Sequence, residues 1–382
     1  MRDIVKNYLE NKKIKTVCFA TEILDFFAKT DKQNIEQDFV DFMDTTIPID
    51  LSITFSQPVA IWYRDVITLE ILDFLHRYFR NKCCDIENIF LITSDSLGLS
   101  EYHQKYCDLN CTKSFTVIEI PGAYWYEKYF NPLIENSSSI NFHRKDNISA
   151  VFSCYGGTYE NNPPDKSVIM LSLAKHNQTS HIESMAKCAD WSAIENYLEY
   201  LTYFKDAKGV ETYKKSFDKY VDSYNNFKIK SPLTINQEKQ RNEHLLGSSY
   251  TWQVDKHCFS TVVRESQNTN YFGMLSEKTL RCFLYGNFVL PVNGHSVVKH
   301  IEDLGFVVDI GLIDYSYLNN CNLYYNMQQL DNELDKLNNL HSTNDLQDIW
   351  NDNYKVLEHN FLHVLHSYKS EVIEKRLKKA FG

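Results

Sequence analysis

The sequence predicts an α/β protein with two domains, each built on a parallel β-sheet. Its 382 residues are more than one hydrophobic core usually organises. In both halves of the chain, short runs rich in Val, Ile and Phe alternate with amphipathic helical segments, which is typical of right-handed β-α-β units. Between the halves, residues 131–147 are polar and irregular, so they predict a linker.

The first domain is expected to span residues 1–147. Its predicted strands lie at 16–20, 59–63, 89–93 and 115–120, and its predicted helices at 4–9, 22–27 and 69–79. Whether residues 1–50 join the sheet or form an insertion on it is left open. Because no Gly-x-Gly-x-x-Gly motif occurs here, we do not expect this domain to bind a dinucleotide.

The second domain is expected to span residues 148–345. Its predicted strands lie at 148–153, 259–263, 287–292 and 306–309, and its predicted helices at 166–173, 191–224, 237–246, 276–285, 295–305 and 323–340. Gly156 and Gly157 follow the first strand, and Lys166 opens the next helix. Such glycines let a diphosphate approach the backbone and the lysine supplies a positive charge, although paired glycines are equally typical of a turn.

The stretch 259–294 carries the clearest functional signal. It reads as a strand, a polar loop with Glu265, a helix beginning after Ser276, a second strand, and a stop at Gly294. In an open parallel sheet, ligands bind outside the carboxyl ends of the strands, where Glu265 and the start of the helix are expected to lie.

The residue types in this stretch suit a nucleotide sugar. The carboxylates of Glu265 and Glu277 suit ribose or sugar hydroxyls, and the helix N-terminus with Lys278 suits a phosphate. The alternative is that Glu277 and Lys278 are only charges in the first turn of a solvated helix.

Three runs in this region resemble the donor-site signature of the fucosyltransferase-like GT-B glycosyltransferases. They are Val263-Arg-Glu-Ser266, Leu275-Ser-Glu-Lys-Thr279 and Gly286-Asn-Phe-Val-Leu-Pro-Val-Asn-Gly294. The chain looks closest to uncharacterised phage and bacterial members with Ser-Glu-Lys-Thr. The resemblance covers residues 258–310, and it departs from the family at Gln267, where the fucosyltransferase form has Glu-Asn-Ser.

This resemblance implies a GT-B fold of two Rossmann-like domains, with a C-terminal helix at 346–382 that crosses back onto the first domain. It also implies that the site residues contact a nucleotide-sugar donor, which is a substrate, so no cofactor is expected. The implied donor-binding residues are Glu265, Glu277, Lys278, Thr279 and Gly294, supported by Gly156, Gly157 and Lys166.

In a GT-B arrangement the first domain receives the acceptor, and inverting transfer needs a carboxylate to take the proton of the acceptor hydroxyl. Asp65 and Asp95 follow predicted strands, and Glu127 follows the aromatic run 124–126. These three are the candidate bases, with turn capping as the alternative role for each.

Composition limits the partners and metals. The net charge of -10 disfavours duplex DNA, since its binding rests on clustered Lys and Arg. Ten cysteines form no Cys-x-x-Cys pair, and no Asp-x-Asp ends a strand, so we expect no metal. His359, His363 and His366 share a helical face, but a structural role is the stronger interpretation.

No signal peptide or membrane-spanning run is visible, so a cytoplasmic location is expected.

The expected function is therefore a metal-independent, inverting glycosyltransferase that moves a sugar from a nucleotide-sugar donor to a hydroxyl on a glycan or lipid-linked glycan. Two alternatives are kept. One is a phage-type transferase that acts on hydroxymethylated DNA bases, and the other is a non-catalytic module that binds a sugar or nucleotide.

Overall fold

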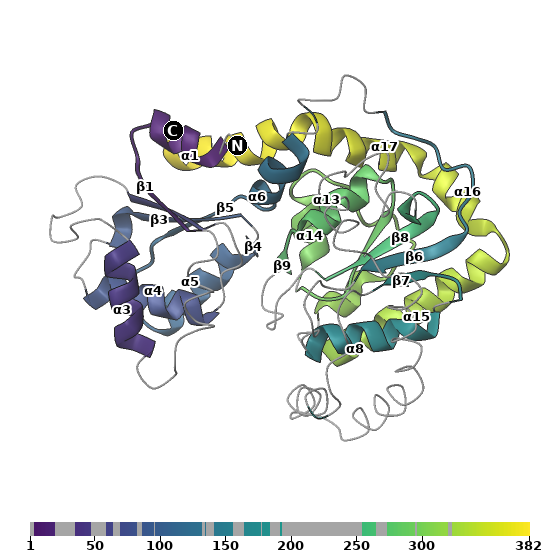
Figure 1. The fold of residues 1–382 in the computed structure, drawn as a ribbon, viewed down its shortest axis with the longest axis horizontal. Coiled ribbons are helices and arrows are strands. Elements are labelled where there is room, and N and C mark those ends of the chain that lie inside the picture. Colours follow the sequence, from purple (N-terminus) through teal and green to yellow (C-terminus); the bar gives the residue numbers. More distant parts are fainter. Residues whose placement is uncertain are drawn as a thin grey trace. The chain divides into compact units, whose positions relative to one another are not determined.

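The computed structural model describes residues 4–19, 35–46, 59–63, 69–81, 86–94, 96–131, 134, 141–155, 164–176, 178–183, 192, 254–264, 273–294, 296–319 and 323–382. The chain forms two compact units (Figure 1). Unit 1 comprises Met1–Pro132, Phe272–Ser276 and His366–Gly382, and unit 2 comprises Leu133–Tyr271 and Glu277–Leu365.

Unit 1 contains a parallel sheet with the strand order β1-β2-β3-β5. The strands are β1 (Lys15–Phe19), β2 (Val59–Tyr63), β3 (Ile89–Thr93) and β5 (Thr116–Glu119). All five residues of the inner strand β2 are buried. Burial on both faces explains why this strand is an unbroken apolar run, as in other parallel sheets. The strands predicted in the first part of the chain are thus confirmed.

Helices cover both faces of this sheet (Figure 1). One face carries α3 (Ile35–Thr46), α4 (Leu69–Asn81) and α5 (Leu99–Leu109), and the other carries α1 (Ile4–Asn11) and α18 (Lys375–Phe381). Ile61, Leu72 and Leu91 belong to the core between the sheet and α4. Helices α3 and α5 were not predicted, and neither was the antiparallel pair β4 (Ser96–Leu97) and β9 (Gly273–Met274).

The end of the chain belongs to unit 1. It forms the π-helical segment η5 (His363–Glu374) and then α18. The Tyr368 hydroxyl donates a hydrogen bond to the Pro121 carbonyl, and Arg376 Nη1 donates to the Glu119 carbonyl at 3.0 Å. The last helix is therefore fixed along β5 and the turn that follows it.

Unit 2 contains a second parallel sheet, with the order β10-β8-β6-β7. Its strands are β6 (Ala150–Tyr155), β7 (His181–Glu183), β8 (Cys258–Val263) and β10 (Phe288–Pro291). Its longer helices are α8 (Pro164–Leu173), α13 (Glu277–Leu284), α15 (Leu323–Ser342), α16 (Asp345–Asp352) and α17 (Tyr354–Leu362). Strands β6 and β8 are buried along their whole length.

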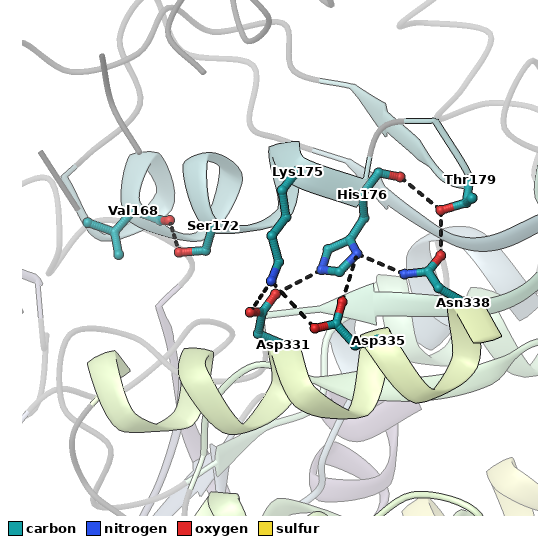
Figure 2. A network of polar contacts seen from close by, with 8 residues as sticks. All are labelled: Val168, Ser172, Lys175, His176, Thr179, Asp331, Asp335 and Asn338. Atoms are coloured by element: carbon teal, nitrogen blue, oxygen red, sulfur yellow. Dashed lines mark hydrogen bonds and ion pairs between the residues drawn. The ribbon is translucent and has the colours of Figure 1, made fainter. Parts of the chain in front are cut away.

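A polar network fastens α15 to the turn η3 (Ala174–His176) (Figure 2). His176 Nε2 lies 2.8 Å from Asp331 Oδ1, and Asn338 Nδ2 lies 2.8 Å from His176 Nδ1. Lys175 forms an ion pair with the same Asp331 carboxylate. Because both ring nitrogens of this buried histidine have partners on α15, the network holds the helix in place.

One predicted strand is wrong. Residues 306–309 form no strand, because side chains rather than a neighbouring strand satisfy their backbone. The amide of Val307 donates to Asn360 Oδ1 at 2.9 Å, and Asn360 Nδ2 donates back to the Val307 carbonyl at 2.7 Å. Glu302 Oε1 accepts from the amides of Val308 and Asp309 at 3.2 and 3.0 Å.

The predicted class is confirmed: the protein is a mixed α/β protein with two parallel sheets, and these are compatible with Rossmann-like folding. The helices expected at 22–27, 191–224 and 237–246 lie outside the described residues. Among those that are described, no helix is long and apolar enough to cross a membrane.

Candidate functional site

The candidate site lies at the carboxyl edge of the sheet in unit 2. Strands β8 and β10 run parallel and adjacent, with Ser260 opposite Phe288 and Val263 opposite Pro291. The helix that connects them, α13, begins at Glu277 directly after Ser276 and ends at Leu284, and in the turn that follows Gly286 has φ +64°. In such a unit the helix starts near the carboxyl ends of the strands, so the first turn of α13 faces the expected ligand position.

Glu277 and Lys278 occupy this first turn and pair with each other. Lys278 Nζ lies 2.7 Å from Glu277 Oε1, and the two side chains are 36% and 22% exposed. Burial acts to raise the pKa of the Glu277 carboxyl, but Lys278 and, further off, Arg281 hold the pKa below its ordinary value. Glu277 is therefore a carboxylate at neutral pH and can accept hydrogen bonds.

Arg281 lies behind this pair and was not singled out from the sequence. It follows Glu277 by one helical turn and is only 4% exposed. Its guanidinium lies 5.7 Å from the centre of the Tyr155 ring. Burial acts to lower the pKa of Arg281, yet Tyr285 and the carboxylates of Asp255 and Glu277 keep it above its ordinary value. The i, i+4 spacing from Glu277 was the available signal.

Asp255 completes this group of charges. It is buried, and Tyr155 donates a hydrogen bond to its Oδ1 at 3.0 Å. Burial raises the pKa of the Asp255 carboxyl, and Arg281 acts against that rise. The pKa values of Arg281, Asp255 and Glu277 thus influence one another, and the Arg281 guanidinium contacts the ring of Tyr155, the residue that donates to Asp255.

A chain of hydrogen bonds continues across the same face of the sheet. Ser153 Oγ lies 3.2 Å from Thr261 Oγ1, and Asn287 Nδ2 donates to Thr261 Oγ1 at 2.8 Å. Lys145 closes the chain with three acceptors: the carbonyls of Asp255 and Cys258, at 3.0 and 2.5 Å, and the side-chain oxygen of Asn287.

This buried lysine fixes a segment that the sequence predicts as linker. Burial lowers the pKa of Lys145 to about 8, and its three donors are matched by three acceptors. The neighbouring Arg144 Nη2 donates to Asn351 Oδ1 at 2.9 Å. Residues 144 and 145 thus belong to the framework of unit 2.

The other predicted donor-site residues differ in burial, in backbone conformation and in whether the structure describes them. Thr279 is fully buried in α13, so it packs inside the unit rather than facing a ligand. Gly294 follows β10 with φ +109°, a conformation that favours glycine. Lys166 lies in α8, without a described side chain. Three positions lie outside the described residues: Glu265, Gly156 and Gly157.

Of the three candidate bases, only Glu127 is described, in the segment η2 (Tyr126–Phe130) of unit 1. It is 6% exposed, and its Oε1 accepts a hydrogen bond from the Val5 amide at 3.2 Å. This contact gives Glu127 a capping role at the start of α1, the alternative considered above. Asp65 and Asp95 lie outside the described residues.

Two of the three C-terminal histidines contact the end of α14 (Val297–Glu302). His359 Nε2 lies 2.9 Å from the Gly305 carbonyl, and His363 Nε2 lies 2.7 Å from the Leu304 carbonyl. Each ring nitrogen donates to a backbone oxygen that the helix leaves unpaired. This geometry supports the structural interpretation of these residues.

Comparison with known proteins adds no family assignment, because no protein-family model matches the chain and no curated protein is significantly similar to it.

Proposed function

We propose that this protein is a cytoplasmic glycosyltransferase of the GT-B arrangement that binds a nucleotide-sugar donor at the first turn of α13. The single observation that carries the proposal is the β8-α13-β10 unit. It brings an ionised carboxylate, Glu277, and a cation, Lys278, to the first turn of one helix, and a buried cation, Arg281, follows in the next turn.

Each group has a stated role in the proposed site. The positive end of the α13 dipole and the Lys278 ammonium bind the diphosphate, since both favour negative charge. Glu277 accepts hydrogen bonds from ribose or sugar hydroxyls. Arg281 stays buried inside the unit and adds positive potential, which stabilises the leaving diphosphate without a metal ion.

The proposed reaction is a displacement at the anomeric carbon. The acceptor oxygen forms a bond to that carbon on one face while the bond to the phosphate oxygen breaks on the other, so the configuration inverts. A carboxylate takes the proton of the acceptor hydroxyl. A glycan or lipid-linked acceptor fits better than DNA, because the net charge of -10 opposes phosphate-backbone binding.

Calorimetric titration with a panel of nucleoside diphosphates tests donor binding. We expect one nucleotide to bind wild type, and Lys278→Ala and Glu277→Gln to weaken binding by about 10–100-fold, since a hydrogen bond to a charged group contributes about 1.5–3 kcal/mol. Lys355→Ala and Asp348→Asn, exposed positions on α17 and α16, are the matched controls and should bind like wild type.

If no nucleoside diphosphate binds wild type, the proposal is wrong. Transfer is tested separately, by following release of the nucleoside diphosphate from the nucleotide sugar with a library of hydroxyl acceptors. Binding without release or transfer contradicts the enzymatic role and supports the non-catalytic module. A gel shift with hydroxymethylated duplex, but not with plain duplex, supports the DNA-modifying alternative.

A further inference from the structure

Three side chains in unit 1 bring metal-binding atoms together away from the site described above. His76 lies on α4, and His103 and Cys107 lie one turn apart on α5. All three are buried, with exposures of 1%, 3% and 2%. Among the described residues, this is the one group of three or more His, Cys, Asp or Glu side chains whose ligand atoms converge, all within 4.8 Å of one another.

The individual distances resemble a coordination shell. Cys107 Sγ lies 3.7 Å from His76 Nε2 and 3.4 Å from His103 Nε2, and the two nitrogens are 2.7 Å apart. Tetrahedral zinc, with bonds of about 2.0–2.1 Å to nitrogen and about 2.3 Å to sulfur, sets nitrogen and sulfur roughly 3.6 Å apart and two nitrogens roughly 3.3 Å apart. The sulfur therefore already stands at the right distance, and the two rings need to separate by roughly 0.6 Å.

The surroundings hold the rings in this orientation. Phe115 stacks on His103, with ring centres 4.3 Å apart, and contacts His76 at 4.7 Å. The i, i+4 spacing of His103 and Cys107 places both side chains on one helix face, and His76 faces them from the neighbouring helix. Side chains from the two helices thus meet at this cluster, and one residue before Cys107 the Tyr106 hydroxyl donates to Asp73 Oδ1 of α4 at 2.5 Å.

A hydrogen bond between two neutral imidazoles is the simpler explanation for the histidine pair. It does not account for the thiol, whose further contact, with the carbonyl of Lys113, is long at 3.9 Å. A metal ion explains why two imidazole nitrogens and a sulfur meet in an otherwise apolar core.

We propose that His76, His103 and Cys107 form a zinc site that joins α4 to α5. Two imidazoles and one thiolate are a ligand set that zinc prefers, and a water molecule completes the tetrahedron. Cys107 releases its proton to solvent on binding. A Cys-x-x-Cys pattern does not detect this set, because its ligands are spread over two helices, and the expectation of no metal rested on that pattern and on the absence of Asp-x-Asp.

The test measures the metal directly. Full-length, untagged protein from zinc-supplemented medium is purified without chelator and analysed by mass spectrometry for metals. The same protein, stripped by dialysis against a chelator, is titrated with Co²⁺. We expect stoichiometric zinc, and with cobalt we expect visible ligand-field bands and a near-ultraviolet thiolate-to-cobalt charge-transfer band.

Variants assign the ligands. Cys107→Ser should abolish the charge-transfer band, and His76→Gln and His103→Gln should weaken cobalt binding at least about tenfold, the lower bound for losing even an outer contact. Cys111→Ser, at an exposed thiol just beyond α5, is the matched control and should keep the band. Wild type without zinc and without a cobalt charge-transfer band overturns the proposal, and so does a band that survives Cys107→Ser. The wild-type measurement decides even if a variant fails to fold.

Discussion

At the scale of single residues, two glycines show how closely unit 2 is packed. Gly305 lies in the turn after α14 with φ +98°, and a Cβ atom there would lie 2.9 Å from the His363 ring. That ring is buried and bonded to the Leu304 carbonyl, so it cannot move aside at low cost. Gly311 has a similar φ of +75°, but nothing lies within 4 Å of its Cβ position.

These glycines provide a matched pair of substitutions. Gly311→Ala should lower the free energy of unfolding by about 1–2 kcal/mol, the cost of a left-handed conformation alone. Gly305→Ala should lower it by about 2–5 kcal/mol, because overpacking adds about 1–3 kcal/mol. Urea denaturation measures both values. Equal losses would show that the histidine ring yields and that the packing argument is wrong.

At the scale of elements, the contact between η3 and α15 depends on one carboxylate. The Asp331 carboxylate contacts both the His176 ring and the Lys175 ammonium (Figure 2). Burial acts to raise its pKa, but these two partners hold the pKa of Asp331 below its ordinary value of 3.8. The more exposed Asp335 stands 3.8 Å from Lys175 and 3.9 Å from His176, so it contributes less.

This difference predicts how stability changes with pH. Between pH 3.8 and the lower folded-state pKa of Asp331, the unfolded chain binds more protons than the folded chain. The stability that the Asp331 carboxylate contributes is therefore fully present above pH 3.8 and is lost as the pH falls through the folded-state pKa. Asp331→Asn should destabilise the protein at neutral pH, and its deficit should shrink as the pH falls through this window. Urea unfolding at a series of pH values measures the effect. Asp335→Asn is the control, and a deficit that does not change with pH would contradict the assignment.

At the scale of the whole molecule, unit 1 is assembled from three separate parts of the chain. The last part, residues 366–382, contributes a row of buried side chains: Tyr368, Val372, Ile373 and Leu377. Burying a side chain of this size contributes about 1.5–3 kcal/mol, so the segment supplies on the order of 10 kcal/mol, comparable with the stability of a typical domain.

Truncation after Leu365 tests this dependence. We expect amide hydrogens of β2, β3 and β5 to lose protection from exchange, because unit 1 opens, whereas those of β6 and β8 keep theirs. Hydrogen exchange read by mass spectrometry reports both units in one sample, and unit 2 is the internal control. Unchanged protection in β5 would show that the segment is dispensable.

The sequence predicted the inner strands of both sheets because apolar runs such as Val59–Tyr63 are buried on both faces and need no partner to be recognised. It did not predict β4 and β9, which are two residues each. It predicted a strand at 306–309 because a local sequence pattern does not reveal the hydrogen bonds that Glu302 and Asn360 make to this backbone. At the site, Glu277 and Lys278 stood out by their place in the helix. Arg281, His76 and Cys107 did not, since their roles depend on side chains from distant parts of the chain.

The return of the final helix to unit 1 has a consequence for synthesis. The N-terminal residues leave the ribosome first, yet the unit they belong to lacks α18 until Lys375–Phe381 have been made. The four described strands of the unit 2 sheet are made in the meantime, so the second unit can complete this sheet before the first is closed. Until then, the apolar surface that Leu377 and its neighbours cover is exposed on the nascent chain. A chaperone can bind this surface until the helix is made.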